Sequence, residues 1–350
     1  MKITGVGRPG KAWVRSAVVL GVALIWGGAV RANPAQDPEE GTPVNLKVNR
    51  QIQATDYDTG SLTTHLLAAN NQNGKKAREL QKTRTPQTTS KNSWGRGGVS
   101  YYPGDLTYQG GEVVQSTESH AVYVNCGAKC FGYPTKFLRK LEKSELIHVT
   151  DQYVGTNANN RYTVGESGKI EYPVSGPLGP SDIITLVYAS ASVFGSGYGQ
   201  VHHIFFAPGI DVCGDAALTV CYSPDNPATF FFCAFHGSID FTDIGHVLFT
   251  VQPYQNVNGC AVGQPSPNGP EVDSQASLLS HELIETITDP DGTAWWNTVS
   301  LALYGSEIGD ECQNSTFVYQ TPWINGTLYE IQPEYSNAAH ACTYRPPYEE

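Results

Sequence analysis

The sequence predicts a single mixed sheet-and-helix domain of about 250 residues, α/β or α+β in class and stabilised by disulfides. Three observations predict it. The chain has 350 residues, which is enough for one large hydrophobic core. After Val99, segments with strand-like alternation of apolar side chains are interspersed with segments of helical spacing. All eight cysteines lie beyond residue 125.

The amino terminus has the pattern of a secretory signal peptide. Residues 1–32 carry five basic residues and no acidic one, and an apolar run at 16–30 leads to the small-residue pattern that ends at Ala32. The run is shorter than the roughly 20 residues that a membrane-spanning helix needs. We therefore expect cleavage after Ala32 and a secreted, extracellular protein with no membrane segment once the signal peptide is removed.

Residues 33–98 are rich in Asn, Gln, Thr, Ser, Lys and Gly and contain few large apolar side chains. Such a segment buries too little apolar surface to offset the entropy lost on ordering. We interpret it as a low-complexity linker or a pro-segment, with a short local element within 52–67. The domain then spans 99–346, and residues 347–350 are a tail.

The first elements of the expected domain are one strand and two helices. Residues 121–125 alternate between apolar and smaller or polar side chains, which is typical of a strand. Residues 136–149 place apolar side chains at helical spacing, among them Phe137 and Leu141. Residues 182–192 follow a Pro-Ser start signal and form the second expected helix.

Three strands and a further helix follow. Residues 201–206, 229–235 and 246–251 are rich in β-branched and aromatic side chains, which favours strands. The Pro- and Gly-rich stretch at 263–270 is a loop. The last helix, 273–287, starts after it, and the remaining chain is irregular and rich in Tyr and Pro.

The cysteines predict a disulfide framework. Their number is even, and an exported protein folds in an oxidising compartment, so four disulfides are expected. Short loops close most easily, which favours pairing between neighbours in the sequence. The candidates are Cys126 with Cys130, Cys213 with Cys221, Cys233 with Cys260, and Cys312 with Cys342.

The charge distribution limits the partners. The formal net charge is −11, and the acidic residues are concentrated after residue 100. A body this acidic repels phosphate backbones and anionic lipid surfaces, so we expect no nucleic-acid or membrane partner. We expect a monomer that acts on a peptide or a cell-wall polymer.

The helix at 273–287 carries the chemistry. Asp273 or Ser274 can cap its start, Pro290 prevents its continuation, and an apolar stripe predicts burial on one side. His281 and Glu285 stand at i and i+4, so they lie side by side and can bind one metal ion.

Glu282 lies one residue after His281 and is placed to take a proton from water bound to that metal. The pattern is the H-E-x-x-H helix of zinc peptidases, with the second His replaced by Glu. Zinc is the expected metal. Because a carboxylate ligand is harder than imidazole, Ca²⁺ or Mn²⁺ are the alternatives.

A metal site needs a further ligand. The segment GSEIGDEC at 305–312 offers Glu307 and Asp310, next to a cysteine expected to be cross-linked. Asp289 and Asp291, just after the helix, are the alternatives, ranked below them in that order. The competing interpretation is a core histidine beside two solvated glutamates.

Two other histidine positions are candidates of lower rank. His236 ends an expected apolar strand, where it can orient a substrate or stabilise an oxyanion. His202 and His203 are adjacent on a strand, so they point to opposite faces and cannot easily bind one ion together.

Two functions of different class therefore remain. The first is a secreted metal-dependent hydrolase, a zinc peptidase in its most specific form. The alternative is a non-catalytic extracellular or cell-wall-associated binding protein with a structural metal or none. Its binding surface would be formed by aromatic residues, namely Trp295, Trp296, Trp323, Tyr329 and Tyr335.

Seven segments in the same order resemble blocks of the phosphate-induced, EXORDIUM-like family of secreted proteins. They run from YQGGEVV at 108–114 and AVYV at 121–124, through strand blocks at 201–209, 233–236 and 249–254, to SHELIETITDP at 280–290 and EIGDEC at 307–312. The last two resemble the zincin-like HExxExxTDP…EIGDxC pair of microbial members. The resemblance implies an exported, extracellular or wall-associated protein, and leaves its activity open.

Overall fold

The structure, a computed structural model, describes residues 41–48, 54–56, 66–84, 102–313 and 321–347. The signal peptide expected at 1–32 and residues 348–350 of the expected tail lie outside these ranges. All described residues belong to the compact unit Asp37–Glu350. Within them, no helix has both the length and the apolar character needed to cross a membrane.

A nine-stranded mixed sheet forms the centre of the described chain, in the order β1-β7-β5-β8-β12-β11-β2, with β6 beside β5 and β3 beside β11. Neighbours from β1 to β12 run parallel, and β11 is antiparallel to β12, β2 and β3. The strands are β1 (Val44–Asn45), β2 (Ala54–Asp56), β3 (Leu66–Ala68), β5 (Thr117–Val124), β6 (Tyr162–Val164), β7 (Gly168–Ile170), β8 (Gly197–Phe206), β11 (Phe232–Phe241) and β12 (Gly245–Gln252).

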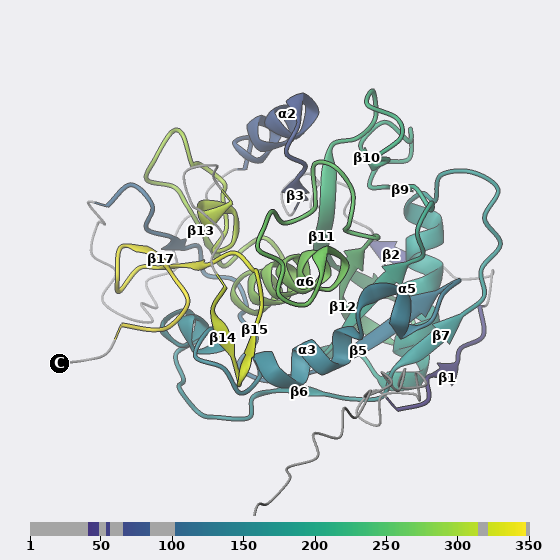
Figure 1. Cartoon of the computed structure of the whole chain (residues 1–350), viewed down its shortest axis with the longest axis horizontal. Helices are drawn as coiled ribbons and strands as arrows, with labels where there is room; N and C mark the ends of the chain where they lie inside the picture. The colour runs from purple at the N-terminus through teal and green to yellow at the C-terminus, as the bar shows by residue number, and fades with distance from the viewer. Residues whose placement is uncertain (1–40, 49–53, 57–65, 85–101, 314–320, 348–350) are drawn as a thin grey trace, which may run out of the picture. The chain divides into compact units, whose positions relative to one another are not determined.

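Helices cover both faces of this sheet. One hydrophobic cluster joins α5 (Pro180–Phe194) to one face, and a second joins α6 (Pro270–Thr288) and α3 (Pro134–Leu141) to the other. Figure 1 shows α6 near the centre of the view, with β11 and β12 beside it. The predicted mixed sheet-and-helix class is therefore confirmed.

Shorter elements complete the fold. The remaining helices are α2 (Gln72–Gln81) and α4 (Asp151–Val154), with 3-10 turns at Ala128–Phe131, Ile147–Thr150 and Asp310–Cys312. The small strands are β4 (Thr107–Tyr108), β9 (Val212–Cys213), β10 (Cys221–Tyr222), β13 (Trp295–Trp296), β14 (Trp323–Ile324), β15 (Thr327–Leu328), β16 (Glu334–Ser336) and β17 (Ala341–Thr343).

The alternation along β8 explains how one strand serves both layers. Ile204 and Phe206 pack with α5, whereas Val201 and Phe205 pack with α6. His202 and His203 point to opposite faces, as expected. His202 Nδ1 lies 2.7 Å from Ser190 Oγ of α5, and His203 Nδ1 lies 2.9 Å from Thr250 Oγ1 of β12. Burial lowers the pKa of each histidine to about 3.

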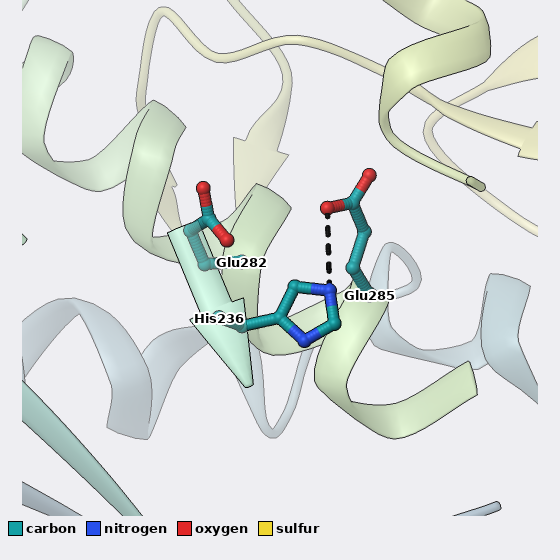
Figure 2. Close-up of side chains that lie close together, drawn as sticks. All are labelled: His236, Glu282 and Glu285. Atoms are coloured by element: carbon teal, nitrogen blue, oxygen red, sulfur yellow. Dashed lines mark ion pairs between the residues drawn. The ribbon is translucent and has the colours of Figure 1, made fainter. Parts of the chain in front are cut away.

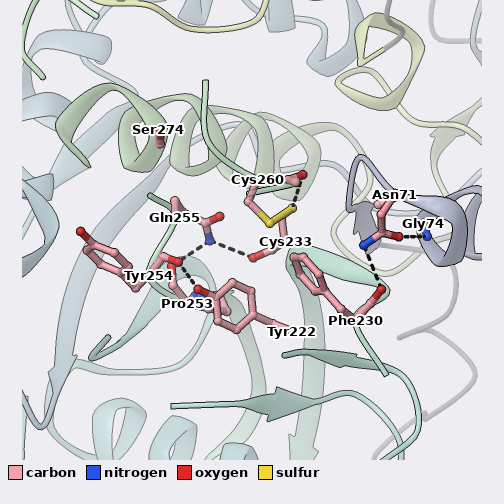
Figure 3. The surroundings of a disulfide bond; sticks show 12 residues. Asn71, Gly74, Tyr222, Phe230, Cys233, Pro253, Tyr254, Gln255, Cys260 and Ser274 are labelled. Carbon is pink, nitrogen blue, oxygen red and sulfur yellow. Dashed lines mark hydrogen bonds between the residues drawn. A yellow bond between two sulfur atoms is a disulfide. The ribbon is translucent and has the colours of Figure 1, made fainter. Parts of the chain in front are cut away.

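The sheet begins before Val99, where the sequence analysis placed the start of the domain. β1, β2, β3 and α2 all lie within 33–98, and Leu66 and Leu67 are buried. The Asn-rich run starts α2, because Asn71 Oδ1 accepts a hydrogen bond from Gly74 N at 2.8 Å. Figure 3 shows this contact together with the bond from Asn71 to the carbonyl of Phe230.

Several predicted element boundaries differ from the structure. The expected helix 136–149 stops at Leu141, where Ser144 Oγ donates a hydrogen bond to the Leu141 carbonyl at 2.7 Å. β11 continues beyond the expected residue 235 to Phe241, so His236 lies inside the strand. α6 starts earlier than expected, at Pro270, and all of its residues from Asp273 to Thr288 are buried.

The four predicted disulfides are confirmed. The pairs are Cys126–Cys130, Cys213–Cys221, Cys233–Cys260 and Cys312–Cys342. Figure 3 shows Cys233 of β11 joined to Cys260 in the loop that leads toward α6. Cys312 lies directly after the acidic segment of the candidate site, so its disulfide fixes that segment to β17.

Candidate metal centre

Three side chains of one face of α6 form the base of the site. Successive residues of an α-helix are about 100° apart, so Glu285 lies about 40° from His281 and about 60° from Glu282 around the helix axis. Glu285 is therefore the middle residue of the three. His281 and Glu282 are 0% exposed and Glu285 is 1% exposed, which places their polar atoms away from bulk water.

Two groups of potential metal ligands share Glu285. In each group the ligand atoms lie within 4.8 Å of one another: His281, Glu285 and Asp310 form one, and His236, Glu282 and Glu285 form the other. Glu285 Oε2 lies 3.1 Å from His281 Nε2 and 3.7 Å from His236 Nε2. Figure 2 shows His236 reaching from β11 toward the two glutamates of α6.

Glu307 belongs to the same cluster but contacts the His236 side of it. Its Oε2 lies 3.1 Å from His236 Nε2, and its Oε1 accepts a hydrogen bond from Arg84 at 3.0 Å. Arg84 also pairs with Asp289 Oδ2 at 2.7 Å. Its guanidinium lies 4.8 Å from the centre of the Trp296 ring. The arginine therefore holds two acidic side chains in fixed orientations.

Two hydrogen bonds hold Asp310 next to Glu285. The backbone N–H of Asp310 donates to Glu285 Oε1 at 3.1 Å, and Gln81 Nε2 donates to Asp310 Oδ2 at 3.0 Å. Asp310 opens the 3-10 turn that ends at the disulfide-bonded Cys312. The downstream segment thus brings a carboxylate to the helix, as expected for a third ligand.

The ring of His281 is fixed by close packing. Gln332 Nε2 lies 2.9 Å from His281 Nδ1 and 3.0 Å from the Gly309 carbonyl. A Cβ atom on Gly309 would lie 2.4 Å from His281 Nδ1, so only glycine leaves room for the ring. These contacts direct His281 Nε2 toward Glu285.

Burial and mutual repulsion raise the pKa of several carboxyl groups in the cluster. Burial is the largest cause for Glu282, followed by the nearby charge of Glu285, and together they raise its pKa well above the usual value. The same two causes, burial and neighbouring carboxylates, raise the pKa values of Glu285, Asp310 and Glu334 well above their usual values.

Several polar atoms of the site make no hydrogen bond within the described part of the chain. They are both carboxylate oxygens of Glu282, both of Glu334, and Nε2 of His281, which approaches Glu285 without hydrogen-bond alignment. Buried polar atoms in native proteins are almost always paired. Carboxylate oxygens and imidazole nitrogens are the atom types that divalent cations use as ligands in proteins.

Two of the sequence candidates lie elsewhere. Asp289 caps the loop after α6 by accepting from the backbone of Ala294 at 2.6 Å, and it pairs with Arg84. Asp291 contacts His246 Nε2 at 3.1 Å and Tyr198 outside the cluster. Of the five expected surface aromatics, Trp296, Tyr329 and Tyr335 are buried, and Trp323 is 68% exposed.

The sequence analysis missed Arg84, Gln332 and Glu334. Arg84 lies in the segment interpreted as a linker, and Glu334 and Gln332 lie in the irregular tail. None of the three belongs to a spaced motif, so only the fold brings them to the cluster.

No family model, curated protein or solved structure matches this chain. The chemistry of the site is therefore inferred from its own side chains.

Proposed function

We propose that the protein is an exported metal-dependent hydrolase, most specifically a zinc peptidase. The cation is held by His281, Glu285 and Asp310, and Glu282 is the general base. The observation that carries the proposal is the convergence of these ligand atoms to within 4.8 Å of one another, beside a fully buried carboxylate with two unbonded oxygens. The resemblance to the phosphate-induced family is compatible with this proposal.

The distances within this group suit a transition metal. Atoms bound to one tetrahedral zinc lie about 3.3 Å apart, and His281 Nε2 is 3.1 Å from Glu285 Oε2. The imidazole favours zinc, while the carboxylates keep Mn²⁺ and Ca²⁺ as alternatives. Asp310 takes the place of the third ligand, and Glu307 faces His236 instead.

Glu282 performs the proton transfers of the proposed reaction. When bound, the cation supplies a Lewis acid and lowers the pKa of a coordinated water. Glu282 would take a proton from the attacking water as the water oxygen bonds to the scissile carbonyl carbon, and would give this proton to the amine nitrogen as the C–N bond breaks. Burial, followed by the charge of Glu285, raises the pKa of Glu282, which makes its carboxylate a stronger base.

The four disulfides support export to an oxidising compartment, and the candidate substrate is a peptide or a cell-wall polymer. The ligands on α6 are buried, so a substrate must displace neighbouring groups to reach them. Gln81, Arg84 and Gln332 are such neighbours, because they contact Asp310, Glu307 and His281.

The second candidate function is a non-catalytic extracellular binding protein with a structural cation. The complete burial of His281 and Glu282 favours it, since structural metal sites are closed to solvent. Trp323 is an exposed aromatic that can stack on a sugar ring. A polysaccharide pull-down that weakens in Trp323→Ala and is unchanged in His281→Ala would favour this function.

Hydrolysis of a casein-derived fluorogenic peptide by the zinc-loaded protein tests the proposal. We expect Glu282→Gln to lower the rate at least about 100-fold while the protein still binds zinc, because the general base is lost and His281, Glu285 and Asp310 remain. Glu271→Gln, in the first turn of the same helix, is the matched control and should keep full activity. Full activity in Glu282→Gln, or none in the zinc-loaded wild type, contradicts the proposal.

A further inference from the structure

We propose that the cluster holds two divalent cations bridged by Glu285, and that the second position is formed by His236, Glu282 and Glu307. This inference rests on the proposed metal centre and extends it to a two-ion centre. It changes the role of Glu282 from base to ligand when the second ion is bound.

The geometry divides the ligands between two positions. His281 and His236 belong to different groups, and each approaches the same oxygen of Glu285, at 3.1 Å and 3.7 Å. Two-metal hydrolase sites hold their ions about 3.5–4 Å apart with shared ligands. The Glu285 carboxylate is approached by the imidazoles of both groups, so it is suited to bridge such a pair.

The second position combines the group of His236, Glu282 and Glu285 with Glu307, which contacts His236. His236 Nε2 lies 3.1 Å from Glu307 Oε2, close to the separation of about 3.3 Å between two ligands of one tetrahedral zinc. Arg84 binds the other oxygen of Glu307 and so orients Oε2 toward His236. Glu282 adds two buried oxygens without a hydrogen-bond partner among the described residues.

Each position also includes a buried group without a hydrogen-bond partner among the described residues. In the first it is His281 Nε2, and in the second it is the carboxylate of Glu282. Figure 2 shows the Glu282 and Glu285 carboxylates above the His236 ring in the view. One cation at the first position therefore leaves the Glu282 oxygens and the imidazole of His236 facing each other without a metal.

The charge balance favours two ions. Six acidic side chains lie in or beside the cluster, and Arg84 pairs with two of them, Asp289 and Glu307. The binding of cations favours the ionised form of these groups. With all six ionised beside Arg84, one divalent cation leaves three uncompensated negative charges and two cations leave one. Buried charges need compensation, so the second ion lowers the cost of burial. The six are Glu282, Glu285, Asp289, Glu307, Asp310 and Glu334.

The metal-to-protein ratio of the full chain, loaded with excess Zn²⁺ and freed of unbound metal, tests this inference. We expect two ions in the wild type and one in each of His236→Gln, Glu282→Gln and His281→Gln. His246→Gln, a histidine of β12 outside the cluster, is the matched control and should keep two. One ion in the wild type that is unaffected by His236→Gln overturns the inference and leaves the proposed single-ion centre intact. A metal-free wild type overturns both.

A second readout does not depend on the folding of any variant. Two Mn²⁺ ions bridged by a carboxylate are magnetically coupled, and isolated ions are not. We expect the electron paramagnetic resonance spectrum of the Mn²⁺-loaded wild type to show a coupled pair at saturation. A spectrum of isolated Mn²⁺ at saturation contradicts the two-ion centre.

Discussion

Gly309 shows how a single residue without a side chain decides the geometry of the site. Its backbone is helical, with φ −79° and ψ −42°, so any residue can adopt its conformation. Glycine is required because the ring of His281 fills the space where a Cβ would be. A larger residue at position 309 should therefore displace the His281 ring and leave the backbone conformation unchanged.

Gly309→Ala should weaken metal binding by about 10- to 100-fold, since the added methyl displaces a ligand from its fixed orientation. The measurement is the Kd for Zn²⁺ by competition with a chromophoric chelator. Gly127→Ala is the control, because a Cβ there meets no atom within 4 Å. Equal affinities in Gly309→Ala and the wild type would show that His281 is not a ligand.

Arg84 is the buried counterion of the cluster. It contacts Asp289 at 2.7 Å and Glu307 at 3.0 Å, and these charges raise the pKa of Arg84 although burial lowers it. A buried pair contributes little net stability, but the loss of one partner leaves the other charge unpaired.

Arg84→Gln should lower the free energy of unfolding by about 3–5 kcal/mol, because two buried carboxylates lose their partner. Urea denaturation measures it. Lys82→Gln is the control: Lys82 pairs with the exposed Glu79 at 2.7 Å, and exposed pairs contribute about 0–1 kcal/mol. A loss for Arg84→Gln as small as that for Lys82→Gln would contradict the role of Arg84 as a counterion.

At the scale of elements, α6 was predictable and its surroundings were not. The 3.6-residue period places His281, Glu282 and Glu285 on one face from the sequence alone. The contact with His236 depends on the register of β11 against β12 and on how α6 lies across both strands. No local pattern encodes that register, so His236 was ranked only as an auxiliary residue.

A second contact between elements ties β12 to the loop after α6. His246 lies 2.8 Å from Asp240 and 3.1 Å from Asp291. Hydrogen bonding to Asp291 raises the pKa of His246, against the effect of burial. Burial acts to raise the pKa of Asp291, but hydrogen bonds from His246, Tyr198 and Ser238 outweigh it and lower that pKa.

These shifts predict a pH-dependent stability. The contribution of His246 is fully present below its unfolded pKa of about 6.5 and is lost as the pH rises through its raised folded pKa. The stability contribution of Asp291 is present above its unfolded pKa of about 3.9 and is lost as the pH falls through its lowered folded pKa. The difference in unfolding free energy between wild type and His246→Gln should thus be larger at pH 5.5 than at pH 8.5. Equal differences in unfolding free energy at pH 5.5 and pH 8.5 would contradict this prediction.

At the scale of the whole molecule, composition and spacing predicted the mixed fold class and the disulfide pairs. The four loops closed by the disulfides span 4, 8, 27 and 30 residues, so neighbour pairing followed from chain length. The participation of 66–84 was not predictable, because its few apolar residues, Leu66 and Leu67 among them, are buried only once β3 pairs with β11 and joins the folded core.

In the proposed centre, metal holds the buried carboxylates together. Without a cation, their repulsion and burial oppose folding, so binding to the folded state should add stability by mass action. Replacing Glu285, the residue shared by both ligand groups, should remove most of this gain.

The most direct test is the thermal unfolding of the wild type and of Glu285→Gln, each with saturating Zn²⁺ and with chelator, together with their metal content. We predict stoichiometric zinc and a Tm raised by several degrees in the wild type, and a much smaller rise with less bound zinc in Glu285→Gln. A wild type that carries no metal and melts at the same temperature with Zn²⁺ and with chelator would show that metal does not hold these carboxylates together.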